Sequence, residues 1–224
     1  MKEHPILFQG AMVRALLAGT KTQTRRILKQ AVGPSLSVGY DEDSRHPGEA
    51  VLSWLTGPGP GYDVEELIKY VKCPYGKPTD RLWVREAIRL VPDQEPDDGT
   101  GRVLSAYDAD HTLTVADAWP WKRSYLPPMH CPRGLSRMDL EITEVRVERL
   151  QDISEADAMA EGIIAHRKGG WHTEQPPAGI EGSNHFGFKT ARDAYGVLWE
   201  SINGPGSWDA NPWVWAVSFK RTNE

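Results

Sequence analysis

The sequence predicts one domain of the mixed α+β class, in which strands form a barrel flanked by short helices. Three observations lead to this prediction. The chain has several strand patterns and only a few short helix patterns. Strands and helices do not alternate regularly, as they would in a parallel nucleotide-binding sheet. The 224 residues are within the size of one large domain, and 39% of them are hydrophobic, which is enough for a core.

The first thirty residues are expected to form a strand, a helix and a corner. A short strand is expected at residues 5–8, and a helix follows up to Ala18. Gly19 comes next, and glycine commonly ends helices in the left-handed conformation. The Thr-rich segment after it favours the start of a strand. The polar residues of this segment therefore lie at a helix-to-strand corner, where functional side chains are common.

Three segments are predicted to be long loop insertions, near residues 30–62, 92–132 and 165–189. The first is rich in Gly, Pro and Ser, and the second in Pro and Trp. Little periodicity is present in either, which is typical of loops. A strand is nevertheless expected at residues 103–107, inside the second insertion.

Between the first two insertions we expect a helix and then a strand. Asp63 can cap a helix over residues 63–72, with Glu66 three residues later as in a capping box. Four apolar residues share one face of this helix: Val64, Leu67, Ile68 and Val71. Residues 81–86 are apolar at the centre and are expected to form a strand.

The clearest strand pattern lies at residues 137–149. Apolar and polar residues alternate there, with a slip near Glu144 that indicates a β-bulge. Ser154 then caps a short helix, which is expected to end at Glu161 because Gly162 follows.

The C-terminal segment is expected to contain a helix and a closing strand. Thr190 can cap a helix that runs to residue 203, and a strand follows at residues 213–219. The apolar stripe of this helix is expected to be buried and consists of Ala194, Leu198, Trp199 and Ile202.

Composition excludes several classes of protein. The net charge of −5 argues against a dedicated, non-specific nucleic-acid binder, although a local basic pocket for one nucleotide remains compatible with it. No apolar run approaches ~18 residues and no charged-then-apolar leader opens the chain, so no membrane association and a cytoplasmic location are expected. Cys73 and Cys131 lie far apart, and no metal-ligand cluster or cofactor motif is present, so neither a metal nor a cofactor is expected. The sequence carries no signal for an oligomeric state.

The corner at residues 17–26 contains the residue types of a base–nucleophile pair. Lys21 and Thr24 are three positions apart, so in a regular strand they would face opposite sides. They can meet only if the chain is still turning at Lys21, or if the long lysine side chain reaches round. A lysine close to a threonine hydroxyl can activate it. The alternative is a solvated lysine and a threonine that merely favours the strand.

The same corner resembles a known family. The sequence GTKTQTRR at residues 19–26 is similar to the G-x-K-x-x-T-x-R signature of ASCH domains, which are small barrels related to the PUA fold. Further segments resemble ASCH-like proteins that are common in phages and prophages. These segments are PILF (5–8), MVRALLAG (12–19), DRLWVRE (80–86), PR (132–133), VRVERLQDISE (145–155) and WVWAVSFK (213–220).

The resemblance implies a PUA-like fold and a reaction. Similar ASCH proteins include N4-acetylcytidine amidohydrolases, in which a lysine is the base, a threonine the nucleophile and a glutamate the proton donor. The first two correspond to Lys21 and Thr24. The glutamate lies in the short helix after the long strand and is placed at Glu161, with Glu155 and Asp157 as alternatives. The implied substrate is a nucleoside that carries an acyl group on N4 of cytosine.

Four further residues are candidates for substrate binding: Arg25, Arg26, Trp83 and Glu86. The two arginines could depress the pKa of Lys21, steady an oxyanion or bind a nucleotide phosphate, or they could simply pair with carboxylates. The tryptophan could stack on a base or be part of the core. Three alternatives to the amidohydrolase remain: a PUA-like module that reads RNA or a modified base, a ribonuclease, and a phage accessory protein without catalysis.

Overall fold

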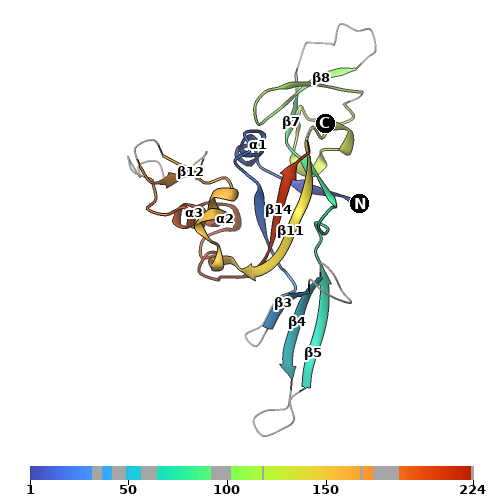
Figure 1. Cartoon of the computed structure of the whole chain (residues 1–224). Coiled ribbons are helices and arrows are strands. Elements are labelled where there is room, and N and C mark those ends of the chain that lie inside the picture. The colour runs from blue at the N-terminus through green and yellow to red at the C-terminus, as the bar shows by residue number, and fades with distance from the viewer. Residues whose placement is uncertain are drawn as a thin grey trace.

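The protein has an α+β structure in which sheets predominate and helices are few, as the sequence predicts (Figure 1). The computed structural model describes residues 1–31, 37–41, 49–56, 65–91, 102–117, 119–166, 169–173 and 187–222.

A five-stranded sheet forms the centre of the molecule. Its strand order is β1 (Glu3–Leu7), β6 (Arg81–Arg85), β11 (Asp139–Arg149), β14 (Trp213–Arg221) and β2 (Gln23–Ile27). The pair β1–β6 is parallel, and the other three pairs are antiparallel. Among the described strands this order is open and does not close on itself, so the PUA-like barrel stays a prediction.

The long strand β11 anchors the core, as its alternating pattern predicts. Leu140, Ile142 and Val145 are buried. In the neighbouring strand β14 they pair with Arg221, Phe219 and Val217. The register shifts between Ile142 and Glu144, so the β-bulge expected near Glu144 is confirmed.

The described residues contain three α-helices beside this sheet: α1 (Gly10–Leu17), α2 (Glu155–Ala160) and α3 (Ala191–Asn203). The N-cap of α3 is Thr190, whose hydroxyl accepts a hydrogen bond from the amide of Asp193 at 3.0 Å. The helices α2 and α3 pack together over a second apolar cluster that includes Leu150, Ala194 and Trp199. None of the described helices is long and apolar enough to cross a membrane.

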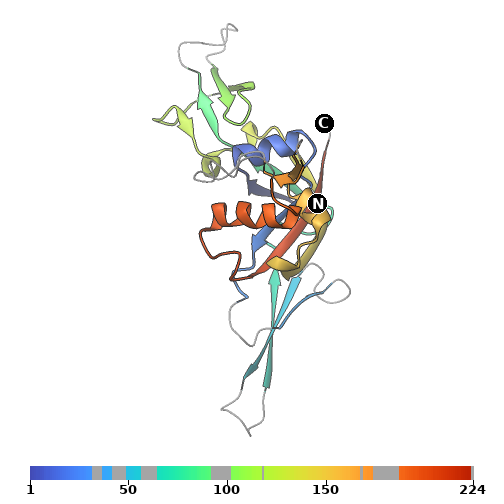
Figure 2. The same cartoon turned by 90° about the vertical axis from the view of Figure 1, so that its left-hand side faces the viewer.

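Smaller sheets extend from two ends of the central sheet (Figures 1 and 2). One consists of β3 (Ser37–Asp41), β4 (Glu49–Thr56) and β5 (Glu65–Lys72). The other has the order β10 (Tyr125–Leu126), β7 (Ile88–Leu90), β8 (Val103–Tyr107) and β9 (Leu113–Ala116). A two-stranded sheet, β12 (Ile164–Ala165) and β13 (Trp171–His172), lies near α3, and 3₁₀ turns occupy Pro128–His130, Arg133–Leu135 and Leu150–Asp152.

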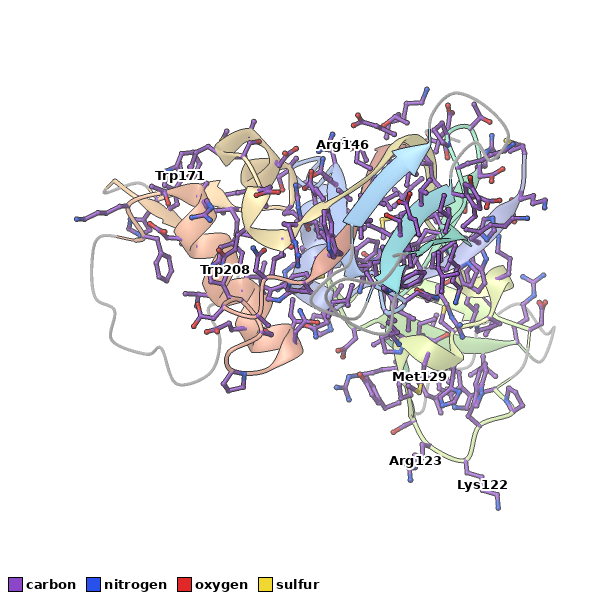
Figure 3. The ribbon with its side chains drawn as sticks, turned by 90° about the horizontal axis from the view of Figure 1, so that it is seen from below. Lys122, Arg123, Met129, Arg146, Trp171 and Trp208 are labelled. Carbon is purple, nitrogen blue, oxygen red and sulfur yellow. The ribbon has the colours of Figure 1, made fainter. Side chains whose placement is uncertain are left out.

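Seen from below, the molecule has two well-separated sides (Figure 3). Trp171 and Trp208 lie on the side of α3, where they pack against the second apolar cluster. Lys122, Arg123 and Met129 lie on the side of the four-stranded sheet, away from these tryptophans.

The helix predicted over residues 63–72 is wrong. Residues Glu65–Lys72 form strand β5, which pairs along its whole length with β4. Ile68, Tyr70 and Val71 have high strand propensity, and eight paired positions outweigh an apolar spacing that also fits a helix. The proposed cap at Asp63 lies outside the described residues.

The prediction that the insertions are mainly loops is also wrong for the parts that are described. The first contains β3 and β4, and the second contains β9 and β10 in addition to the predicted strand at Val103–Tyr107, which is confirmed. Ala50 and Leu52 of β4 are completely buried and join the same core as the central sheet. The segments at 92–101 and 174–186, predicted as loops, lie outside the described residues.

Candidate active site

Lys21 is buried and lies just after the end of α1. Gly19 adopts a φ of 74°, the left-handed conformation that the sequence predicts. The amide of Lys21 donates to the carbonyl of Ala15 at 3.1 Å, so the chain is still turning there. Strand β2 begins only at Gln23. Lys21 is therefore not constrained to the alternating faces of the strand.

The end of α2 delivers Glu161 to the same place. Ser154 caps this helix, as predicted, and Glu161 is its C-terminal cap, followed by Gly162 with a φ of 100°. The amide of Thr22 donates to the carbonyl of Ala160 at 2.8 Å, and Lys21 and Glu161 form an antiparallel β-bridge. Two helix ends that are 140 residues apart in the chain are thus joined through their backbones.

The side chains of Lys21 and Glu161 form a buried ion pair. The amine Nζ lies 2.6 Å from Oε2 of Glu161 and also donates to the carbonyl oxygen of Glu161 at 2.8 Å. The exposed fractions of the two side chains are 0% and 4%. The ring of Phe8 covers the amine, with 5.7 Å between Nζ and the ring centroid. Water is therefore excluded from the point where the two groups meet.

Burial sets the protonation behaviour of Lys21. It lowers the pKa of the amine, because the low-dielectric interior disfavours the charged form. The charge of Glu161 and its hydrogen bond raise this pKa, whereas the charges of Arg26 and Arg25 add to the lowering, and the net pKa lies below the ordinary value of 10.5. A lysine with a lowered pKa can act as a base closer to neutral pH.

The second carboxylate oxygen of Glu161 faces two other donors. The hydroxyl of Tyr195 donates to Oε1 at 3.3 Å, and Nη1 of Arg25 lies 3.6 Å from the same oxygen. Tyr195 is itself buried, so its pKa is raised well above the ordinary value, first by burial and then by the charge of Glu161. The phenol is therefore a permanent hydrogen-bond donor that holds the carboxylate in place.

Arg25 is fixed by a network of polar side chains. Its Nη2 lies 2.5 Å from Oε1 of Glu148 and 3.4 Å from Oδ2 of Asp157, and its Nη1 donates to Gln23 Oε1 at 2.5 Å. Burial alone would raise the pKa of Asp157. Hydrogen bonds from Ser154 and Gln23 and the charge of Arg25 act in the opposite direction, and the net pKa is below the usual value. The guanidinium of Arg25 thus binds other side chains of the protein, and its charge helps to stabilise the Glu161 carboxylate.

The alternatives for the glutamate have other contacts. Asp157 belongs to the network around Arg25. Both oxygens of Glu155 accept hydrogen bonds from the first amides of α3, at 2.7 Å from Ala191 and 3.2 Å from Arg192. Of the three acidic residues, Glu161 is the one paired with Lys21.

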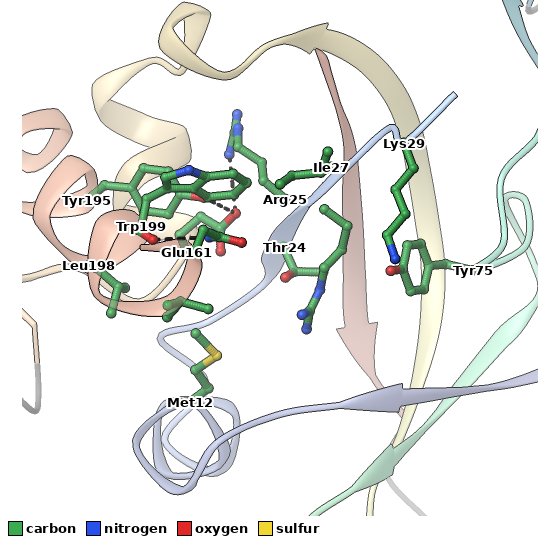
Figure 4. Close-up of a pocket in the computed structure, with 13 residues that line it drawn as sticks. Met12, Thr24, Arg25, Ile27, Lys29, Tyr75, Glu161, Tyr195, Leu198 and Trp199 are labelled. Carbon is green, nitrogen blue, oxygen red and sulfur yellow. Dashed lines mark hydrogen bonds and ion pairs between the residues drawn. The ribbon is translucent and has the colours of Figure 1, made fainter. Parts of the chain in front are cut away.

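A cavity of about 240 Å³ opens beside the ion pair (Figure 4). Thr24 and Glu161 both line it, whereas Lys21 lies behind Glu161 and does not. The remaining wall is formed by Met12, Arg25, Arg26, Ile27, Lys29, Tyr75, Tyr195, Leu198, Trp199, Ile202 and Asn203. The cavity is therefore lined partly by apolar and aromatic groups, with a few polar groups among them, as is common for small-molecule sites.

Thr24 faces this cavity without a fixed partner. Its residue is 3% exposed, and no hydrogen bond of its hydroxyl is found among the described residues, including one to Lys21 Nζ. The predicted direct contact between the amine and the hydroxyl is thus absent in this structure. The hydroxyl is free to turn toward a molecule in the cavity.

Trp83 and Glu86 lie elsewhere. Trp83 sits in β6, with the guanidinium groups of Arg85 and Arg133 at 5.4 and 5.9 Å from its ring. Glu86 is buried and binds Arg137 through two hydrogen bonds of 2.8 Å. Neither lines the cavity, because β11 and β14 separate β6 from β2 in the sheet.

Sequence reasoning missed the contribution of α3 to the site. Burial of the predicted stripe is confirmed for Ala194 and Trp199, which belong to the second apolar cluster. Trp199 also lines the cavity, together with Leu198 and Ile202, and Ile202 is 38% exposed, so its predicted burial is wrong. Tyr195 was not singled out, although it lies four residues before Trp199 and therefore on the same face of the helix. A tyrosine within the apolar stripe of this helix is the sequence signal that could have identified Tyr195 as a site residue.

Comparison with known proteins gave no match to a family model, to a curated protein or to a solved structure. Among the described residues, no group of three or more His, Cys, Asp or Glu side chains is arranged to hold a metal ion.

Proposed function

We propose that the protein is an amidohydrolase that removes acyl groups from N4 of cytosine nucleosides. The observation that carries this proposal is the buried contact of 2.6 Å between Lys21 and Glu161, beside a cavity that Thr24 and Glu161 share. Hydrolysis of an amide needs a base, a nucleophile and a proton donor for the leaving nitrogen. The three residues supply these three groups.

The ion pair can provide an acid and a base together. Burial disfavours the charged form of Lys21, and at 2.6 Å a proton can pass from its ammonium to the Glu161 carboxylate. The products of this transfer are a neutral amine and a carboxylic acid. The amine is then a base for the Thr24 hydroxyl, and the carboxylic acid is a proton donor that lines the cavity.

The reaction then proceeds in two halves. Oγ1 of Thr24 attacks the acyl carbon, and its proton goes to the amine of Lys21. The bond between the acyl carbon and N4 breaks, N4 takes the proton of the Glu161 carboxyl group, and cytidine leaves. Water then attacks the ester on Thr24, which releases the carboxylic acid and restores the hydroxyl. The missing contact between Lys21 and Thr24 is expected to form when substrate binds, since catalytic hydrogen bonds often tighten only in the complex.

The rest of the cavity suits a planar base. Tyr195 and Trp199 offer aromatic surfaces next to Glu161, and Leu198 and Ile202 extend this wall. A volume of about 240 Å³ favours a small molecule over a large one. The similarity of residues 19–26 to the ASCH signature supports the same substrate class, and membership of the ASCH family with a PUA-like fold is part of the proposal.

Purified protein incubated with N4-acetylcytidine tests this proposal directly, by the change in ultraviolet absorbance as cytidine forms. The wild-type protein should turn over, and Lys21→Met, Thr24→Ala and Glu161→Gln should each lose most of the activity. Thr22→Ala is the matched control, because Thr22 lies in the same corner but is exposed and does not line the cavity.

Two results would count against the proposal. Absence of turnover by folded wild-type protein across acetyl-, propionyl- and benzoyl-cytidine would refute the activity. Full activity in Thr24→Ala would instead remove the acyl-enzyme step and leave Lys21 to activate a water molecule.

A further inference from the structure

The end of the cavity opposite Glu161 carries positive charge. Figure 4 shows Lys29 and Tyr75 at one end of the cavity, and Glu161, Tyr195 and Trp199 at the other. Arg26 also lines the cavity, and its charge acts on the phenol of Tyr75, since it partly opposes the rise in the Tyr75 pKa that burial causes. An ammonium and a phenol thus line the end of the cavity that the proposed chemistry does not use, and the guanidinium of Arg26 lines the cavity within electrostatic range of both this phenol and Lys21.

Among the described residues, the cations at this end have no acidic partners. At the other end Glu161 pairs with Lys21, and Glu148 and Asp157 pair with Arg25, so those charges are matched. Neither Arg26 nor Lys29 forms an ion pair with any acidic side chain in the part of the chain that the structure describes. The charge at this end is therefore available to an anion from outside.

Arg26 is held in place without using most of its donors. Its Nη2 donates to the carbonyl of Leu7 at 2.7 Å, and its guanidinium lies 5.4 Å from the centroid of the Phe8 ring. Its Nε is buried and has no hydrogen-bond partner among the described residues. The guanidinium is thus oriented by one hydrogen bond and one ring, and the edge formed by its two Nη atoms has the planar, forked geometry with which arginine binds phosphate.

The spacing along β2 relates this end to the nucleophile. Thr24 and Arg26 are two residues apart in the strand, so they share a face and their backbones are about 6–7 Å apart. A molecule with its acyl carbon at Thr24 would therefore place a group on the far side of its base and sugar near Arg26 and Lys29.

We propose that Arg26, Lys29 and Tyr75 form a phosphate subsite, and that the substrate of the enzyme is an N4-acylated cytosine nucleotide with a phosphate on its sugar. This proposal rests on the proposed function for the identity of the base. A nucleoside monophosphate carries its acyl amide and its phosphate at opposite ends, which matches the two ends of the cavity. Phosphate bound by arginine forms charge-assisted hydrogen bonds, which are stronger than neutral ones.

Binding of product analogues tests the subsite without any turnover. Calorimetry with the wild-type protein should give an affinity for cytidine 5′-monophosphate about 10- to 100-fold higher than for cytidine, as expected for hydrogen bonds to a charged group. Arg26→Gln should bring this ratio close to one, and Arg26→Lys should retain part of it, because lysine keeps the charge but loses the fork. Arg123→Gln is the matched control, since Arg123 lies on the far side of the molecule, and the ratio should be unchanged (Figure 3).

The subsite is refuted if the wild-type protein binds both ligands equally, or if folded Arg26→Gln keeps the full ratio. Turnover separates this failure from that of the proposed function. Hydrolysis of N4-acetylcytidine and of its 5′-monophosphate with the same kcat/KM, together with equal binding, leaves the function standing without the subsite. Absence of hydrolysis of either compound, together with tighter binding of the monophosphate through Arg26, leaves the subsite standing without the function.

Discussion

Replacement of Lys21 by methionine should destabilise the protein strongly. It leaves the carboxylate of Glu161, which is 4% exposed, without its partner at 2.6 Å. Breaking a buried ion pair in this way costs about 3–5 kcal/mol. We expect the lower end, about 3 kcal/mol, because the hydroxyl of Tyr195 at 3.3 Å and the guanidinium of Arg25 at 3.6 Å still face the carboxylate.

The double variant Lys21→Met/Glu161→Gln should recover most of this stability. It removes both charges, so no uncompensated charge remains buried, which is the main cost of the single replacement. Thermal unfolding of the wild type, both single variants and the double variant measures the coupling, and about 3 kcal/mol corresponds to a fall in Tm of roughly 6–12 °C in Lys21→Met. The double variant should nevertheless be inactive. A Tm of Lys21→Met within about 2 °C of the wild type, or additive losses in the double variant, would refute the buried pair.

Three further predictions follow from the same contacts. Activity should fall at high pH with a midpoint below 10.5, because the reaction uses the one proton that Lys21 and Glu161 share and burial lowers the pKa at which Lys21 loses it; a midpoint at or above 10.5 would contradict this. Tyr195→Phe should reduce kcat about 10-fold with little change in KM, since the hydroxyl positions Glu161 and the phenylalanine ring keeps the aromatic surface of the cavity; an unchanged kcat would remove that role of the hydroxyl. Ser154→Ala should lower Tm by roughly 2–4 °C through loss of the cap that binds the amide of Asp157, and an unchanged Tm would show that the cap is dispensable.

Local signals in the sequence predict the ends of the helices that build the site. The glycine at position 19 and the Ser154 cap identify where α1 ends and where α2 begins, and Gly162 identifies where α2 ends. These features depend on a few neighbouring residues, so they can be recognised without knowledge of the fold. They place Lys21 and Glu161 just after helix ends, although the contact between them spans 140 residues.

Features that depend on distant partners were not predictable in the same way. Residues 65–72 have an apolar spacing that fits a helix, and pairing with β4 decides that they form a strand. Ile202 belongs to an apolar stripe, but only the position of α3 beside β2 makes that stripe face a cavity. Trp83 and Glu86 are residue types that can bind a nucleoside, but they lie far from the other candidates. The sheet order places β11 and β14 between them and Thr24.

The most direct test of the account is the mass of the protein during turnover of N4-acetylcytidine. Rapid acid quenching followed by peptide mass spectrometry should find an acetyl group on Thr24 in the wild type, and none in Lys21→Met, which lacks the base. Release of cytidine with no acetylated Thr24 at any time, and with full activity in Thr24→Ala, would contradict the assignment of this residue as the nucleophile. Absence of both cytidine and acetylated protein would contradict the enzyme itself.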